Sequence, residues 1–234
     1  MGKRIIARAR GKGGPRYKSP SHRYLGRVEY ASTNNIKGEV VDIVHDPGRT
    51  APVAVIKLED GKKIYHIASE ELKVGDTINY DKGLSVGNVL SLSEIPDGTK
   101  IHCIETFPGS GPKICRSGGS FAMVVGKTDD KVTVRFSSGK IKTIDSKCRA
   151  TIGVPAGSGR MEKPFTKAGK KFYALSARGR LYPITKGVVM SPVDHPYGGR
   201  SKRPRHGKAV SRSAPPGAKV GSIAPRRLGK KKGK

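Results

Sequence analysis

The sequence predicts an all-β protein of two small barrels, with an extended basic arm at each end. Between residues 38 and 153, short apolar runs alternate with turn signals at a spacing of roughly 8–12 residues, as in small closed barrels. A chain of 234 residues is long enough for two small domains. Its hydrophobic content of 35% is low, but it suffices for compact β-rich cores if long segments stay unfolded.

The charge is concentrated at the two ends of the chain. Residues 1–27 carry nine Lys and Arg and no acid, residues 28–194 carry twenty-five against eighteen acids, and residues 195–234 carry thirteen against none. The formal net charge of +29 implies a polyanionic partner, with nucleic acid favoured over an anionic membrane or an acidic protein. We therefore expect basic arms on a mildly basic body.

The N-terminal arm, residues 1–27, is rich in Arg, Lys and Gly. It has too little apolar surface to offset the entropy of ordering it, so we expect it to be disordered alone. Its aromatic side chains, Tyr17, His22 and Tyr24, can stack on bases or riboses. The alternative is a solvated tail.

The first barrel is expected over residues 28–95. Its predicted strands are separated by turn residues, above all by the Asp46-Pro47-Gly48-Arg49 turn. These strands are 40–44, 53–58, 64–67 and 72–78.

The second barrel and a following basic loop are expected over residues 96–186, after a connector at 94–99. A hairpin through Ser137-Ser138-Gly139 is predicted because Gly supplies the turn geometry between two alternating runs. From Gly157 to Gly179 the chain is rich in Gly and Lys and predicts a short helix or loop that passes over RNA. The predicted strands of this part are 101–106, 122–125, 132–136 and 141–144, and residues 148–153 close the unit.

Three arginines in the body are candidate RNA contacts. Arg49, at the tip of its turn, can offer a fork of hydrogen bonds to phosphate or guanine, although it can equally be a plain exposed turn residue. Arg116 precedes Gly118-Gly119, whose backbone amides can point at a phosphate. Arg149, at the close of the second barrel, is a weaker candidate on the same grounds.

The last segment, residues 187–234, begins with a Gly/Pro hinge. Pro192 and Pro196 exclude a helix there, while Gly198 and Gly199 allow another molecule to approach closely. Beyond the hinge, proline-spaced basic residues favour an arm that threads between RNA helices over a solvated tail. The candidate RNA-binding residues of this segment are Asp194, His195, Gly198, Gly199, Arg200, Lys202, Arg203 and Arg205.

The sequence does not support an enzymatic role for the adjacent residues Asp194 and His195. Adjacent residues in a Pro-bounded segment tend to point apart, and no nucleophile elbow, phosphate-binding loop or metal-ligand cluster accompanies them. We expect Asp194 to fix the turn through backbone amides and His195 to pack on RNA. The three cysteines, Cys103, Cys115 and Cys148, lack zinc spacing and are expected to be reduced and buried. No cofactor, metal or small-molecule substrate is expected.

The hinge carries a family resemblance. Met190, Pro192 to Pro196 and Gly198-Gly199 resemble the most distinctive stretch of the universal large-subunit ribosomal protein L-two family, and residues 219–227 look like its archaeal and eukaryotic branch. The family usually has Asn in place of Ser191. Its bacterial members have a second His in place of Tyr197 and a third Gly in place of Arg200.

The resemblance implies a fold and a function. It implies an oligonucleotide-binding-fold-like barrel followed by an SH3-like barrel, with Arg49 and Arg116 at positions that contact rRNA and the hinge near the peptidyl-transferase centre. The expected protein is a non-enzymatic, cytoplasmic constituent of the large ribosomal subunit that binds rRNA and neighbouring ribosomal proteins and supports assembly. No stretch approaches the ~20 apolar residues of a membrane span. The alternative is a translation or RNA-chaperone factor that binds transiently.

Overall fold

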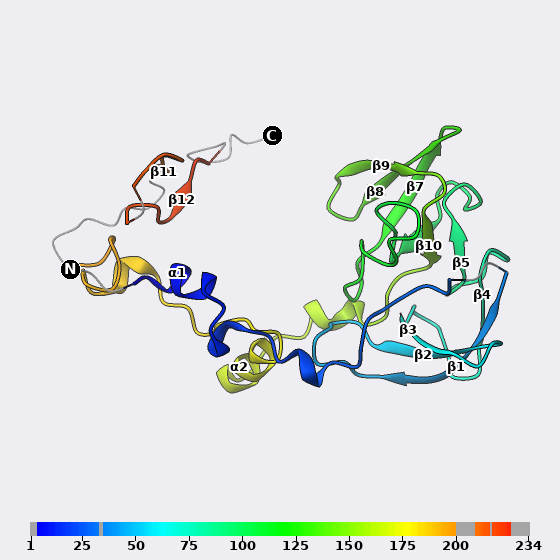
Figure 1. Ribbon diagram of the computed structural model, residues 1–234, viewed down its shortest axis with the longest axis horizontal. Helices are drawn as coiled ribbons and strands as arrows, with labels where there is room; N and C mark the ends of the chain where they lie inside the picture. Colours follow the sequence, from blue (N-terminus) through cyan, green and yellow to red (C-terminus); the bar gives the residue numbers. More distant parts are fainter. Residues whose placement is uncertain (1–3, 33–34, 200–208, 216, 226–234) are drawn as a thin grey trace. The chain divides into compact units, whose positions relative to one another are not determined.

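The computed structural model describes residues 4–32, 35–199, 209–215 and 217–225 (Figure 1). The chain divides into two compact units. The sheet unit is Pro20–Lys170, and the arm unit combines Met1–Ser19 with Lys171–Lys234. The prediction of a mostly β chain is confirmed, but the described residues also contain two short α-helices.

The first sheet of the sheet unit is antiparallel, with the order β3-β2-β1-β4. Buried and exposed residues alternate along β1 from Lys37 to Val40, so this part of the strand turns one face toward the core, and a bulge between Val40 and Asp42 interrupts the alternation. The expected strand at 72–78 is shorter than predicted, because Gly75 takes a φ of +93° and the amide of Lys73 donates to the Asp76 carboxylate at 2.7 Å, which makes a turn. The four strands are β1 (Lys37–Val44), β2 (Val53–Leu58), β3 (Lys63–Ile67) and β4 (Thr77–Asn79).

The second sheet is also antiparallel and has the order β5-β10-β6-β7-β8-β9. The predicted hairpin joins β8 to β9, with Gly139 at a φ of +80°. The expected strand at 101–106 ends early, because Cys103 adopts a left-handed φ of +53°. The strands are β5 (Val89–Ser91), β6 (Lys100–His102), β7 (Ala122–Lys127), β8 (Lys131–Phe136), β9 (Ile141–Asp145) and β10 (Arg149–Ile152).

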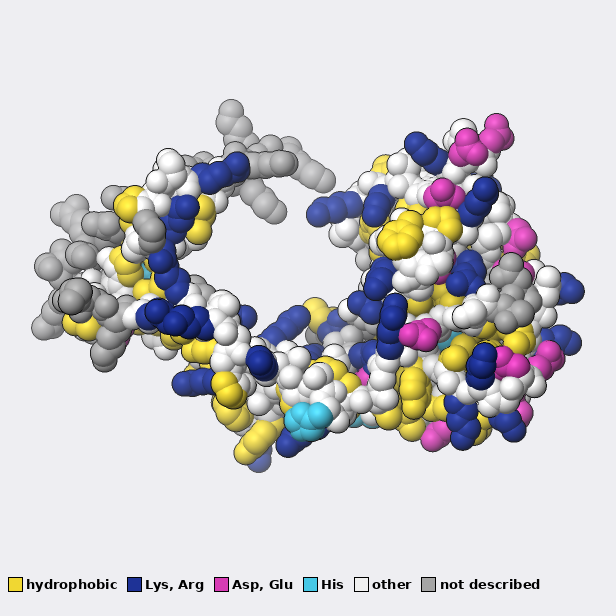
Figure 2. All heavy atoms as spheres, viewed as in Figure 1, with side chains coloured by type: hydrophobic (Ala, Val, Ile, Leu, Met, Phe, Trp, Pro, Cys, Tyr) yellow, Lys and Arg dark blue, Asp and Glu magenta, His cyan; other side chains and the backbone are white. Residues whose placement is uncertain are grey.

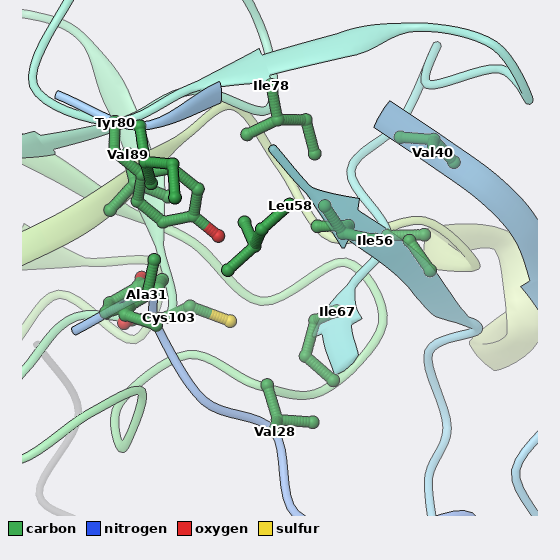
Figure 3. Packing of buried hydrophobic residues seen from close by; sticks show 14 of the residues in the cluster. Val28, Ala31, Val40, Ile56, Leu58, Ile67, Ile78, Tyr80, Val89 and Cys103 are labelled. Atoms are coloured by element: carbon green, nitrogen blue, oxygen red, sulfur yellow. The ribbon is translucent and has the colours of Figure 1, made fainter. Parts of the chain in front are cut away.

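Each sheet has its own cluster of buried apolar side chains. The first includes Val40, Ile56 and Ile78 together with Tyr80 (Figure 3). The second is built on β5 to β10 and the segment between β5 and β6. Burial of these side chains is the main favourable term for each sheet.

Buried hydrogen bonds join the two sheets within the sheet unit. The Tyr30 hydroxyl donates to the Cys103 carbonyl oxygen at 2.7 Å and lies 2.8 Å from Thr151 Oγ1. Ser69 Oγ and His102 Nε2 form a second bond of 2.9 Å across the same junction. The Tyr30 hydroxyl and the Nε2 atom of His102 are thereby paired across this junction.

The arm unit is less regular. In the described residues, helix α1 (Ile6–Gly11) lies in the basic N-terminal arm, which forms one unit with the C-terminal part of the chain; disorder of the arm alone stays a prediction. Helix α2 (Ala168–Ser176) begins at the end of the sheet unit and agrees with the helix expected in the Gly/Lys-rich stretch. The remaining elements are short: 3₁₀ turns at Pro15–Tyr17, Ser21–Arg23, Ser158–Met161 and Gly187–Val189, and the parallel pair β11 (Ala209–Val210) and β12 (Ser222–Ile223).

Hydrophobic burial in the arm unit is slight. Among its described residues, Val220 is the one buried hydrophobic side chain. None of the helices in the described part of the chain has the length and apolar content that a membrane span requires.

Candidate nucleic-acid interface

Charged side chains are unevenly distributed over the visible face of the molecule (Figure 2). Lys and Arg are seen on both units, whereas the Asp and Glu seen on this face lie mainly over the sheet unit. A polyanion is therefore attracted more strongly to the arm unit.

Arg49 is held within its own turn. Its guanidinium forms an ion pair with the buried Asp46 carboxylate and donates to the Gly26 carbonyl oxygen. The amide of Gly48 donates to the same carboxylate at 2.8 Å, and only 22% of the Arg49 side chain is exposed. The Arg49 guanidinium, which we expect to face RNA, thus stabilises the turn. RNA binding by Arg49 stays a prediction.

Arg149 is also held by the sheet unit. Its Nη1 donates to the Ala31 carbonyl oxygen at 2.8 Å, its Nη2 lies 3.4 Å from Glu105 Oε1, and its guanidinium lies 5.3 Å from the Tyr30 ring centroid. The side chain is 18% exposed. These contacts connect β10 with the segment before β1.

Arg116 differs from the other two because its side chain is exposed. The glycines after it do not offer their amides to a ligand: Gly118 donates to Thr50 Oγ1 at 3.1 Å and Gly119 to the Pro155 carbonyl oxygen at 2.9 Å. This corrects the expectation that these amides face a phosphate. Glycine is needed at Gly118 for packing, since a Cβ there would lie 2.8 Å from the Gly157 carbonyl oxygen.

The hinge is a chain of tight turns. The amides of Asp194 and His195 both donate to the Ser191 carbonyl oxygen, at 3.0 and 3.1 Å. The amide of Gly198 donates to the His195 carbonyl oxygen at 2.9 Å, and that of Gly199 to Met190 at 3.2 Å. A Cβ at Gly198 would overlap the carbonyl oxygens of the first turn, so the reversal requires glycine. The prediction of a turned segment without an α-helix is confirmed.

His195 helps to hold this turn. Its Nδ1 accepts the amide N–H of Tyr197 at 3.0 Å, and the two rings meet edge to face with centroids 5.2 Å apart. The Tyr197 hydroxyl in turn donates to the Val220 carbonyl oxygen at 3.0 Å. Amide binding by Asp194 stays a prediction, the structure adds amide binding by His195, and the link from Tyr197 to Val220 has no signal in the sequence.

The hinge also forms one wall of a cavity of about 570 Å³. The N-terminal arm supplies Arg4 and Arg8 to this cavity, and the hinge supplies Pro192, Asp194 and His195. Two arginines distant in the sequence therefore face the hinge, which sequence spacing does not reveal. The candidates Arg200, Lys202, Arg203 and Arg205 lie outside the described residues.

The cysteines have the character of buried structural residues. Cys103 and Cys148 are buried and Cys115 is half-buried. Burial raises the pKa of the Cys103 thiol well above its usual range, and raises the pKa values of Cys115 and Cys148 to about 11. In the described segments, no group of three or more His, Cys, Asp and Glu side chains is placed to hold a metal ion.

The chain matches two family models that together cover most of its length. One, described as Ribosomal Proteins L2, RNA binding N-terminal domain, matches residues 3–80. The other, described as Ribosomal Proteins L2, C-terminal domain, matches residues 85–219.

Full-length relatives agree with this match. Large ribosomal subunit protein uL2 of Methanothermobacter thermautotrophicus is 48% identical over 241 residues, which cover 99% of this chain and 100% of the relative. The uL2 protein of Methanococcus vannielii is 46% identical over 240 residues, with the same coverage. That of Methanoculleus marisnigri is 48% identical over 239 residues, 98% of this chain and 99% of the relative. The chain therefore belongs to the ribosomal protein uL2 family, a family of structural proteins of the large ribosomal subunit.

Proposed function

We propose that this protein binds large-subunit rRNA, supports assembly of the large subunit and maintains the architecture around the peptidyl-transferase centre. The observation that carries the proposal is the match to the uL2 family along nearly the whole chain. The strongly basic ends can bind rRNA because they neutralise phosphates where RNA helices converge. The rRNA performs the chemistry, and the protein holds its fold.

The arrangement of the sheets supports a finer assignment of the fold. We assign the first sheet to an oligonucleotide-binding-fold-like barrel over residues 28–95 and the second to an SH3-like barrel within residues 96–186. The arms are residues 1–27 and 187–234. Strand β5 pairs with β10 of the second sheet, so the two barrels share the chain around residues 89–91.

The candidate residues divide into two roles under this proposal. Arg116 and the basic residues of the arms contact phosphates directly, which fixes the position of the protein without reading sequence. Arg49 and Arg149 act from within the sheet unit by holding RNA-facing loops in place. Gly198 and Gly199 shape the hinge for close approach to RNA. Neighbouring ribosomal proteins complete the environment, and we assign no cofactor or small-molecule substrate.

The first test is sedimentation of cell extract through a sucrose gradient in moderately high salt, with this protein followed by immunoblot. We expect it to remain with the large subunit, because salt removes peripheral factors but leaves structural proteins that are buried in RNA. A known peripheral factor on the same gradient serves as the control. Movement of this protein to the top fractions would support a transient RNA-binding factor instead.

Replacement of His195 tests the structural role of the hinge. We expect His195→Gln to reduce the yield of assembled large subunits, because the ring no longer supports the Tyr197 turn, while subunits that do assemble form peptide bonds at the normal rate. The measurement is subunit yield from gradients together with the single-turnover rate of purified subunits. Normal assembly with a collapsed chemical step would contradict this role.

A further inference from the structure

Two phenylalanines of the sheet unit, Phe107 and Phe165, are exposed and belong to neither core. Phe107 is 63% exposed and lies in the loop that leaves β6, in the sequence Thr106-Phe107-Pro108-Gly109-Ser110. A single exposed apolar residue is common on protein surfaces, so a role for Phe107 has to come from the loop that carries it.

The loop that carries Phe107 is anchored from beneath by a buried carboxylate. Glu105 is fully buried, and its Oε2 accepts the amide of Gly109 at 3.2 Å, while its Oε1 accepts the amide of Gly111 at 3.0 Å. Ser110 closes the loop: its Oγ accepts the Thr106 amide at 3.0 Å, and its own amide donates to the Phe107 carbonyl oxygen at 3.1 Å. Phe107 thus lies on a pre-organised loop, so little conformational entropy of the loop is lost when a ligand binds.

A polar cavity adjoins the same loop. It has a volume of about 350 Å³ and is lined by Gly109, Ser110, Gly111, Arg27, Arg149 and residues of the segment before β1. This volume is in the lower part of the size range of small-ligand sites. Arg27 is 73% exposed, and its partner Glu29, which also lines the cavity, is 51% exposed; such a surface ion pair is weak, so the Arg27 guanidinium can turn to a phosphate.

We propose that Phe107 is a stacking platform for one unpaired base of the bound RNA, and that the adjoining cavity receives the sugar and phosphate of that nucleotide. This rests on the RNA binding proposed above and adds a specific site to it. Bases stack on aromatic rings whatever their identity, so the site reads an unpaired nucleotide rather than a sequence. An aliphatic anchor of a partner protein is the competing occupant.

Two substitutions separate these occupants. Phe107→Leu keeps an apolar side chain but removes the aromatic face. Phe107→Trp keeps an aromatic face. The full-length chain is titrated with large-subunit rRNA transcript at fixed salt and with competitor RNA. We expect Phe107→Leu to weaken binding about ten-fold and Phe107→Trp to bind within about two-fold of the unsubstituted chain. The control is Ile141→Ala on β9, another exposed apolar residue (65%), which should leave binding unchanged.

The salt dependence gives a second readout. Stacking releases no counterions, so Phe107→Leu should leave the slope of log K against log salt unchanged. Arg116→Ala, which removes an exposed cation from the same sheet unit, should reduce that slope by about 0.7–0.9.

The outcomes are distinct. Normal binding by Phe107→Leu, or equal weakening by Leu and Trp, overturns the stacking site while leaving RNA binding intact. If the unsubstituted chain shows no preference for rRNA over competitor, the proposed function and this site fail together. Equal thermal unfolding midpoints among the variants confirm that the fold is unchanged.

Discussion

Glu105→Ala is expected to lower the free energy of unfolding by about 3–5 kcal/mol, because it removes a fully buried carboxylate that several groups share as their acceptor. In addition to the two loop amides, Glu105 Oε2 accepts the backbone amide of Arg149 at 3.0 Å, and Oε1 faces the Arg149 guanidinium at 3.4 Å. Removal of the carboxylate therefore leaves an arginine that is only 18% exposed, together with three backbone donors, without this acceptor.

Urea unfolding followed by circular dichroism measures this effect without the charge screening that guanidinium salts introduce. Glu105→Gln keeps an acceptor oxygen and should lose less stability than Glu105→Ala. Glu94→Ala, at an exposed glutamate, is the matched control and should change stability little. A loss below about 1 kcal/mol for Glu105→Ala would show that the loop amides find other partners.

Acidification is expected to destabilise the sheet unit through two buried histidines. Burial lowers the pKa values of His66 and His102 from 6.5 to about 3 in the folded protein. His66 Nε2 is paired with the Tyr80 hydroxyl at 2.7 Å, and in the described structure the buried Nδ1 of His102 has no hydrogen-bond partner to accept an added proton. The unfolded chain binds protons below pH 6.5 and the folded chain only near pH 3, so stability falls as the pH drops through this window.

Each histidine contributes at most about 1.4 kcal/mol per pH unit in this window. Carboxylates add to the acid response, so the informative quantity is the difference between variants. His102→Gln should show a shallower loss of unfolding free energy between pH 6.5 and 4.5 than the unsubstituted chain, in urea titrations at each pH. The control is His45→Gln at an exposed position. Parallel pH profiles for His102→Gln and the unsubstituted chain would contradict this account.

Local patterns in the sequence predicted the strands well where pairing follows alternation. The run 53–58 coincides with β2, and the Ser137-Ser138-Gly139 hairpin joins β8 to β9. The errors fall where tertiary contacts decide the backbone, as at Cys103, whose left-handed φ ends β6 early. Such a conformation is rare for a residue with a Cβ and leaves no mark in a propensity pattern.

The candidate arginines show the same limit at the level of side chains. A turn arginine such as Arg49 has the same sequence signature whether its fork faces solvent or a neighbouring carboxylate. The partner of Arg149, Glu105, lies 44 residues away, so no local window contains the pair. Family resemblance identified the function, whereas only the fold separates the exposed Arg116 from the two arginines that hold the sheet unit together.

The hydrogen bonds between the sheets impose an order on synthesis. When a translating ribosome has completed β4, Tyr30 has been made, but its partners Cys103 and Thr151 follow it by 73 and 121 residues. At about 5–20 residues per second, the second partner arrives roughly 6–24 s after Tyr30. During this interval the nascent first sheet keeps polar groups that its own strands cannot satisfy. The first half of the sheet unit therefore reaches its final stability only after the second half has been translated.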